Sequence, residues 1–183
     1  MRITSGELGG RTLLVPKTDA IRPTQDRVRE ALFSMLQCEV PGAAFLDLFA
    51  GTGAVGLEAI SRGASRATFV ELSPKHVDVL RRNVENFRKS SVAEIVRSDA
   101  YRYLASYSGP GFDIAFADPP YALGEERGYA SVLATLAERG VVKPGGLFIA
   151  EMTSVQRSGE TPGWELVRDR TYGKTRLCVW RRV

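Results

Sequence analysis

Short apolar runs alternate with amphipathic segments along most of the chain. The apolar runs predict strands at 44–48, 66–71, 92–97, 112–117 and 143–150. The segments between them predict helices near 53–62, 74–88, 99–106 and 126–139. Strands that alternate with helices usually form a parallel sheet with helices on both faces, so this pattern favours an α/β fold.

Both ends of the chain depart from this alternation. Residues 1–15 alternate apolar and polar positions around Gly9-Gly10, which predicts a small N-terminal β-hairpin. Residues 164–182 predict an antiparallel hairpin that would close the sheet. Before the first core strand, Thr24 is the predicted N-cap of a helix that runs through Leu36.

A glycine-rich turn follows the first predicted core strand. Gly51 and Gly53 let the backbone turn tightly and let a ligand approach with no Cβ in the way. The next strand ends in Glu71, 18 residues beyond Gly53. Nucleotide-binding α/β folds place an acid near this distance to bind ribose hydroxyls, so Glu71 is the ribose candidate. Asp47 either holds the turn by accepting backbone N–H bonds or touches the ligand.

A second motif, Asp118-Pro119-Pro120-Tyr121, follows the strand predicted at 112–117. The Asp118 carboxylate and the Pro119 carbonyl can act as two acceptors, which suit the two hydrogens of an exocyclic NH2 group. Tyr121 offers a face on which a flat base could stack for about 1–3 kcal/mol. The motif therefore predicts a clamp for an aromatic amine, and the alternative is an ordinary turn at a strand end.

The two motifs together resemble the class I S-adenosylmethionine (SAM)-dependent methyltransferases that act on exocyclic nitrogens. The first motif has the pattern Asp47-x-Phe49-x-Gly51-x-Gly53. The resemblance implies a Rossmann-like fold with a mainly parallel seven-stranded sheet, SAM as methyl donor, S-adenosylhomocysteine as product, and Asp118, Pro119 and Tyr121 as catalytic residues. It places these residues in the cofactor site: Asp47, Phe49, Gly51, Gly53, Glu71, Leu72, Asp99, Ala100 and Asp118.

The N-terminal region resembles one branch of these enzymes, the RsmD family of bacterial 16S ribosomal RNA guanine-N2 methyltransferases. The similarity lies in residues 2–11 and 22–33 and continues to Tyr172-Gly173-Lys174-Thr175. It implies methylation of N2 of a guanine in 16S rRNA, presented in a small-subunit assembly particle. The candidate RNA contacts are Arg22, Thr24, Arg27 and Arg29.

Three other functions remain open on the sequence. The same clamp would accept the N6 amine of adenine in DNA or RNA, although the chain has no separate target-recognition segment. A protein glutamine methyltransferase usually carries Asn where Asp118 stands. A catalytically inert SAM-binding or RNA-binding module would not need intact acids and glycines in both motifs.

Composition is consistent with these expectations and sets limits on them. The formal charge is +4, and 20 of the 25 basic residues are arginines, which suits an RNA partner but also a GC-rich genome. With 183 residues we expect one domain, 1–183, with an extension at 1–40 and a core at 41–183. No apolar run approaches the ~20 residues of a membrane span, and the N-terminus lacks the apolar core of a secretory signal, so we expect a cytoplasmic protein. We also expect a monomer. Cys38 and Cys178 lack metal-ligand spacing, and we expect two buried reduced thiols and no metal.

Overall fold

The computed structural model describes residues 1–16, 23–119, 121–154 and 161–183, and gives only the backbone of residues 23–25 and 121–128. The chain divides into two compact units, Met1–Asp99 and Ala100–Val183, which are described separately below. Within the described part of the chain, no helix combines the length and apolar character that crossing a membrane requires. The expectation of one domain over 1–183 stays a prediction.

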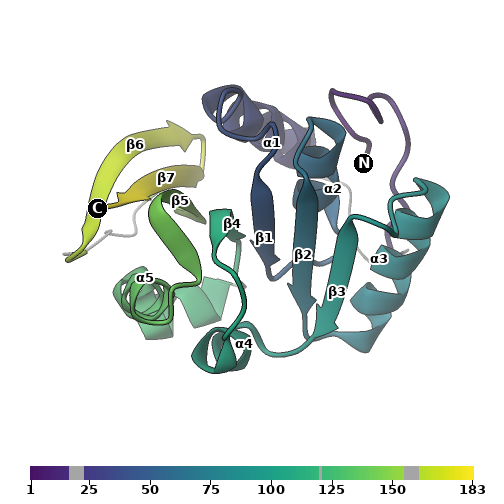
Figure 1. Ribbon diagram of the computed structural model, residues 1–183. Helices are drawn as coiled ribbons and strands as arrows, with labels where there is room; N and C mark the ends of the chain where they lie inside the picture. The colour runs from purple at the N-terminus through teal and green to yellow at the C-terminus, as the bar shows by residue number, and fades with distance from the viewer. Residues whose placement is uncertain (17–22, 120, 155–160) are drawn as a thin grey trace. The chain divides into compact units, whose positions relative to one another are not determined.

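The first unit contains a parallel three-stranded sheet in the order β3-β2-β1 (Figure 1). Its elements are α1 (Pro23–Met35), β1 (Ala44–Leu48), α2 (Ala54–Ser61), β2 (Arg66–Glu71), α3 (Pro74–Asn86) and β3 (Ala93–Arg97). The apolar runs predicted these strands to within one residue. Every residue of β1 is buried, as the continuous apolar run requires in a parallel sheet.

The N-terminal segment, residues 1–16, forms a short hairpin that is fixed on the first unit. An antiparallel bridge joins Arg2 to Thr12, and backbone hydrogen bonds join Ile3 to Arg11 and to Gly10, and Leu13 to Met1. The segment also buries Ile3, Leu8 and Leu13 and packs closely on α2. At Gly6, where φ is +79°, a Cβ would lie 1.9 Å from the carbonyl oxygen of Ser61, so only glycine fits there.

A buried carboxylate holds the N-terminal segment to the helices. Glu58 of α2 is fully buried, and it accepts hydrogen bonds from the backbone N–H groups of Thr4 (2.8 Å) and Ser5 (3.0 Å). It also pairs with Arg29 of α1 (3.4 Å) and Arg62 (2.8 Å). One acid therefore connects three parts of the first unit.

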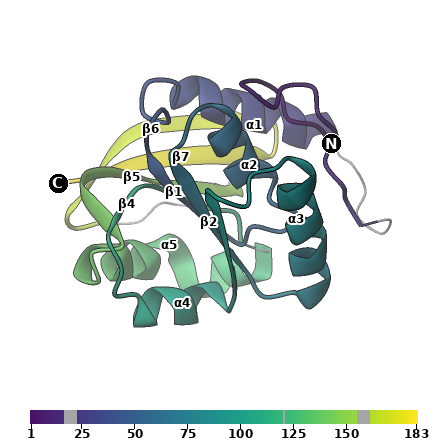
Figure 2. The same cartoon turned by 45° about the vertical axis from the view of Figure 1, so that its right-hand side comes forward.

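The second unit begins with a helix and contains a mixed four-stranded sheet in the order β4-β5-β7-β6. Its elements are α4 (Ala100–Ser106), β4 (Phe112–Ala117), α5 (Tyr121–Glu138), β5 (Val142–Thr153), β6 (Trp164–Tyr172) and β7 (Thr175–Arg182). β4 and β5 are parallel, and the hairpin of β6 and β7 adds antiparallel to β5 (Figure 2). The predicted C-terminal hairpin is confirmed, whereas α5 begins five residues before the predicted 126.

An aromatic cluster fills the core of the second unit. The Phe148 ring lies 6.2 Å from Tyr129, 6.3 Å from Trp164 and 5.8 Å from Trp180, measured between ring centroids. Such ring pairs add about 0.5–1.5 kcal/mol each beyond the burial of their surface. They fix α5 and the C-terminal hairpin to β5, the strand next to β4.

Candidate active site

The turn after β1 has an unusual backbone, which side chains of the first unit hold in place. Three of its residues have positive φ: Phe49 (64°), Gly51 (55°) and Gly53 (84°). A positive φ is strained for a phenylalanine, at a cost on the order of 1–3 kcal/mol, and persists only where the surroundings enforce it. The sequence predicted the two glycines but not the conformation of Phe49.

Asp47 supports the turn from inside the sheet. Its carboxylate is 2% exposed and accepts a 2.8 Å hydrogen bond from the backbone N–H of Gly56, in the first turn of α2. A Cβ on Gly56 would lie 2.3 Å from the ring of Phe69, so this glycine permits the helix to pack closely on β2. The sequence left two roles open for Asp47, a hydrogen bond to the backbone or a contact with the ligand. The structure shows the hydrogen bond to the backbone.

Glu71 joins the end of β2 to the same turn. One carboxylate oxygen accepts from the N–H of Gly51 (2.7 Å) and the other from the N–H of Ser73 (2.8 Å). His76 Nδ1 lies 3.9 Å from the carboxylate. Since an ionised carboxylate has about four acceptor positions, these two bonds leave capacity for ribose hydroxyls.

The residues beside Glu71 also suit a nucleoside. Leu72 is a large apolar side chain with 61% of its surface exposed, and it directly follows the strand end. Asp99, half-buried, lies two residues beyond the end of β3, which pairs with β2 through Glu71 and Arg97. A Cβ built on Gly51 meets no atom within 4 Å, so the turn is open on that side. The carboxylate acceptors and the apolar surface are of the kinds that ribose hydroxyls and an adenine ring require.

Asn83 is a residue of this region that the sequence did not reveal. Its amide donates a 2.9 Å hydrogen bond to the carbonyl of Thr52, between the two glycines of the turn. Asp47, Glu71 and Asn83 thus hold the turn at three points. In the sequence, an asparagine in an amphipathic helix looks like any other polar residue, so its position did not indicate that it is buried and bonded to the turn.

The second motif lies in the second unit, directly after β4. Asp118 is exposed and Pro119 is buried. Burial of the Asp118 carboxyl among protein atoms raises its pKa from 3.8 to about 6, although the residue as a whole is exposed. Ala100, buried, is the first residue of α4. Pro120 lies outside the described residues, and Tyr121 is described only as the first residue of α5, so stacking by Tyr121 stays a prediction.

A second acid, Glu151, lies beside Asp118. Ala117 and Ala150 are paired on the parallel strands β4 and β5, and Asp118 and Glu151 are the next residues on each strand. Burial, and then the charge of Asp118, raise the pKa of Glu151 from 4.5 to about 8. The hydroxyl of Tyr129 donates to the Glu151 carbonyl (2.7 Å), and burial raises the pKa of that hydroxyl. The sequence did not reveal this pair, because it depends on the register of two strands.

One predicted RNA contact, Arg29, and one predicted helix cap, Thr24, need correction, whereas the RNA contact of Thr24 stays a prediction. Arg29 is 4% exposed and bonds to Asp26 (3.0 Å), Glu58 and the carbonyl of Arg2, so it stabilises the first unit and cannot reach a phosphate. Thr24 is not an N-cap, because α1 already begins at Pro23. Arg27 is exposed, as a contact residue must be.

The expectations for Arg22 and for the two cysteines have different outcomes. Arg22 lies outside the described residues. Cys178 is buried as expected, but Cys38 is exposed, because it lies in the turns after α1 rather than in the helix. Among the described residues, no three side chains of His, Cys, Asp or Glu gather as a metal site would require.

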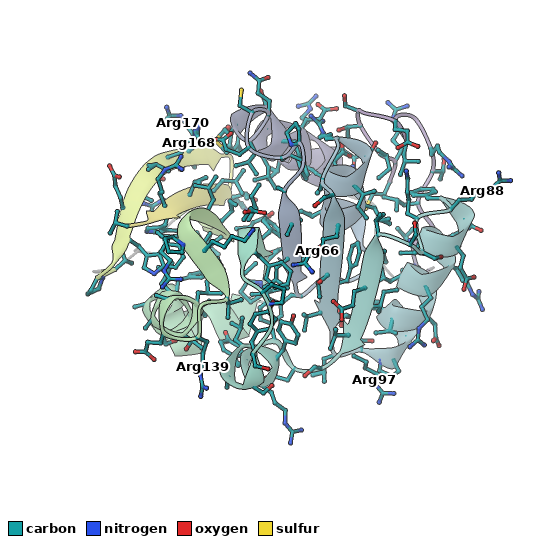
Figure 3. The ribbon with its side chains drawn as sticks, in the orientation of Figure 1. Arg66, Arg88, Arg97, Arg139, Arg168 and Arg170 are labelled. Carbon is teal, nitrogen blue, oxygen red and sulfur yellow. The ribbon has the colours of Figure 1, made fainter. Side chains whose placement is uncertain are left out.

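Figure 3 shows how other arginines are placed. In the first unit Arg66, Arg88 and Arg97 come from the start of β2, the residues after α3 and the end of β3. In the second unit Arg168 and Arg170 are on β6, and Arg139 follows α5. The labelled arginines of the first unit therefore come from three different elements, and those of the second unit come from two. The number of arginines alone does not define an RNA-binding face.

Comparison with known proteins identifies the class and then the family. The chain superimposes over its full length on a putative methyltransferase from Escherichia coli, yhhF, with a TM-score of 0.87, 34% identity and 97% of that chain covered. A more distant structure, the putative methyltransferase SMU.776 complexed with SAH, has a TM-score of 0.70 and 18% identity over 88% of this chain and 50% of its own, and shares the fold. The fold is that of an α/β, Rossmann-like class I methyltransferase.

Sequence relatives show which branch of this class is present. Residues 1–181 match the family described as Conserved hypothetical protein 95. Ribosomal RNA small subunit methyltransferase D of Escherichia coli is 35% identical over 185 aligned positions, which cover 100% of this chain and 90% of that protein. The chain belongs to this family, the RsmD family of methyltransferases.

Proposed function

We propose that this protein transfers a methyl group from SAM to the exocyclic N2 of a guanine in 16S rRNA of the small ribosomal subunit. The observation that carries the proposal is the full-length similarity to a relative named for methylation of small-subunit ribosomal RNA. The placement of Asp118 at the end of β4, exposed and beside a second acid, supports an amine acceptor. We further propose that the protein acts in the cytoplasm as a monomer on an assembly particle.

In this proposal the carboxyl ends of β1, β2 and β3 hold the cofactor. Glu71 binds the ribose hydroxyls with its remaining acceptor positions, and Asp99 accepts from the adenine amino group. Leu72 and Ala100 cover the adenine, and the turn from Phe49 to Gly53 lies against the methionine part. When bound, SAM supplies a methyl group that its sulfonium already activates.

The clamp makes the acceptor nitrogen reactive. The amine lone pair of guanine is delocalised into the ring, so the nitrogen is a poor nucleophile. Two acceptors, the Asp118 carboxylate and the Pro119 carbonyl, hold its hydrogens and favour a tetrahedral nitrogen. As the N–C bond forms, positive charge develops on the nitrogen, and the carboxylate stabilises it.

Asp118 then disposes of the surplus proton. Its pKa of about 6 keeps the carboxyl ionised at neutral pH, ready to accept a proton from the methylated amine. A carboxyl with a pKa below 7 releases that proton again at neutral pH, so Asp118 returns to its ionised form. Tyr121 would hold the base by stacking once the guanine has left its own stack, at a cost of a few kcal/mol.

The test is a methylation assay on small-subunit particles and on naked 16S rRNA with isotopically labelled SAM. Mass spectrometry of the nuclease digest should show labelled N2-methylguanosine with the wild-type protein. Asp118→Asn, which keeps the shape and removes the charge, should slow single-turnover transfer by roughly 10²–10³-fold while SAM binding is retained. Label in N6-methyladenosine would support the rival adenine activity. Absence of transfer to both substrates, with SAM bound, would support an inert module.

A further inference from the structure

Asn83 is a fully buried polar side chain in the last turn of α3. Burying an amide costs free energy on the order of 1–3 kcal/mol unless its donors and acceptor find partners. In this structure they do. The partners lie in two segments far apart in the sequence, which points to a role beyond the packing of the helix.

Three hydrogen bonds use the amide. The side-chain oxygen accepts from the backbone N–H of Leu14 (2.8 Å), and the nitrogen donates to the carbonyl of the same residue (3.0 Å). The nitrogen's other hydrogen goes to the carbonyl of Thr52 (2.9 Å). Asn83 therefore pairs with Leu14 as a neighbouring β-strand would, and links it to the glycine turn.

The N-terminal segment at the other end of this link is itself fixed. The N–H of Leu8 donates to the Ser61 hydroxyl (2.9 Å), and that of Glu7 donates to the Ser61 carbonyl (2.8 Å). The contacts of Thr4 with Glu58 add to this attachment. The N-terminal segment is thus attached to α2 by several hydrogen bonds, and Asn83 connects the segment to the glycine turn.

We propose that Asn83 is a positioning residue through which the N-terminal segment holds the glycine turn in the form that binds the cofactor. The proposal rests on the cofactor site proposed above. Thr52 lies between Gly51 and Gly53, whose positive φ values give the turn its shape. Glycine adopts many backbone conformations, so this part of the turn has little preference of its own for the observed one. Loss of the hydrogen bond to the Thr52 carbonyl should therefore let the turn leave that conformation. Loosening residue 14 should then weaken cofactor binding, although no residue of the N-terminal segment belongs to the proposed cofactor site.

An asparagine amide is the side chain that suits this position. Aspartate would keep the acceptor for the Leu14 N–H but lose both donors. Leucine would fill a similar volume and leave three backbone groups without partners. Asn86, one turn further along α3, has an exposed side chain and provides a control of the same residue type.

The first experiment measures S-adenosylhomocysteine binding by calorimetry. Asn83→Asp should lose about tenfold in affinity, as expected for the loss of one to two hydrogen bonds, and Asn83→Ala should lose at least as much. Asn86→Ala should bind like wild type. Wild-type affinity in a folded Asn83→Asp protein would overturn the proposal, because Asn83 would then be only a satisfied core residue.

The second experiment leaves Asn83 untouched. Leu14 is 43% exposed, so Leu14→Ala should change little, whereas Leu14→Pro removes the N–H that donates to Asn83. We expect weaker S-adenosylhomocysteine binding for the proline variant alone. Equal binding by the two variants would contradict transmission through the N-terminal segment.

Amide hydrogen exchange separates this proposal from the cofactor assignment. In the protein without ligand, the amides of Gly51 and Gly53 should exchange faster in Leu14→Pro and Asn83→Asp than in Leu14→Ala and Asn86→Ala. If wild-type protein failed to bind S-adenosylhomocysteine, the proposed cofactor site would be wrong. The exchange rates would still show whether Asn83 holds the turn. Equal rates in all four variants would contradict that proposal.

Discussion

Glu151 lies next to Asp118 across the β4–β5 pair, close enough for the charge of Asp118 to raise the pKa of Glu151. The two acids therefore titrate as a pair. Asp118 ionises first, near pH 6, beside a Glu151 that is still protonated. At neutral pH the pair carries one negative charge, which lies on the exposed residue.

The first prediction concerns the pH dependence of methyl transfer. The rate of a single turnover should rise as pH increases through about 6, because only the ionised Asp118 stabilises a developing cation. Rates measured between pH 5 and 8 with saturating cofactor would reveal this step. Asp118→Asn should be slow throughout and show no rise near pH 6. A rise of the same size in that variant would assign the titration to another group.

The second prediction concerns stability and Glu151. Its pKa in the folded protein is raised to about 8, so the folded state binds this proton more tightly than the unfolded chain does. The stability that results is complete below the unfolded value near 4.5 and is lost as pH rises through 8. Glu151→Gln cannot ionise, so its urea midpoint should fall less than that of wild type between pH 5 and 9.

Glu138 provides the control for that measurement. It is exposed at the end of α5, and Glu138→Gln should keep the wild-type dependence on pH. If Glu151→Gln also lost stability as steeply as wild type, Glu151 would not be the group that titrates.

The third prediction tests Glu71. Glu71→Ala removes the acceptor of the Gly51 N–H and the proposed ribose ligand, so S-adenosylhomocysteine affinity should fall by about 1–3 kcal/mol. Glu71→Gln keeps one acceptor oxygen and should lie between wild type and the alanine variant. Glu85→Ala, an exposed acid of α3, should bind normally. Unchanged calorimetry in Glu71→Ala would rule out the assignment.

The fourth prediction separates Arg27 from Arg29. If Arg27 contacts a phosphate, Arg27→Ala should reduce the slope of log affinity for RNA against log salt by about 0.7–0.9. Arg29→Ala should instead lower the free energy of unfolding by about 3 kcal/mol or more, since it leaves the buried carboxylate of Glu58 short of a partner. Salt titrations of RNA binding and urea unfolding of both variants make the comparison. A reduced salt slope in a fully stable Arg29→Ala protein would contradict the structure.

Periodicity predicted most of the core strands to within one residue, because they are short and mainly apolar. β5 is the exception at its end, since it continues to Thr153, three residues beyond the predicted 150. Periodicity predicted the ends of the helices less well. The start of α5 was placed too late, because Pro120 and Gly124 are typical loop residues, although a proline directly before a helix does not prevent its first turn. At the N-terminus, alternation predicted the hairpin, but it did not reveal the further bonds from the backbone of the segment to α2 and to Asn83.

Sequence patterns could locate the residues of the proposed cofactor site that directly follow predicted strands. Gly51, Gly53 and Glu71 stand at strand ends that the apolar pattern defines. Asn83 and Glu151 each interact with residues of other helices, strands or turns. The pattern of a single sequence does not show which side chains of different elements come into contact. Arg29 shows the reverse error, since a cluster of arginines suggested RNA while burial next to Glu58 gives this one a structural role.

The aromatic cluster around Phe148 also determines what optical spectroscopy can report. Both tryptophans and all six tyrosines fall between Ala100 and Val183, and Trp164 and Trp180 are buried against Phe148. Intrinsic fluorescence and near-ultraviolet circular dichroism will therefore follow the second unit almost alone. An unfolding curve from tryptophan emission can look complete while the unit that carries the glycine turn is still folded. A tryptophan placed at exposed Leu72 would give the first unit its own signal and report on ligand at the end of β2.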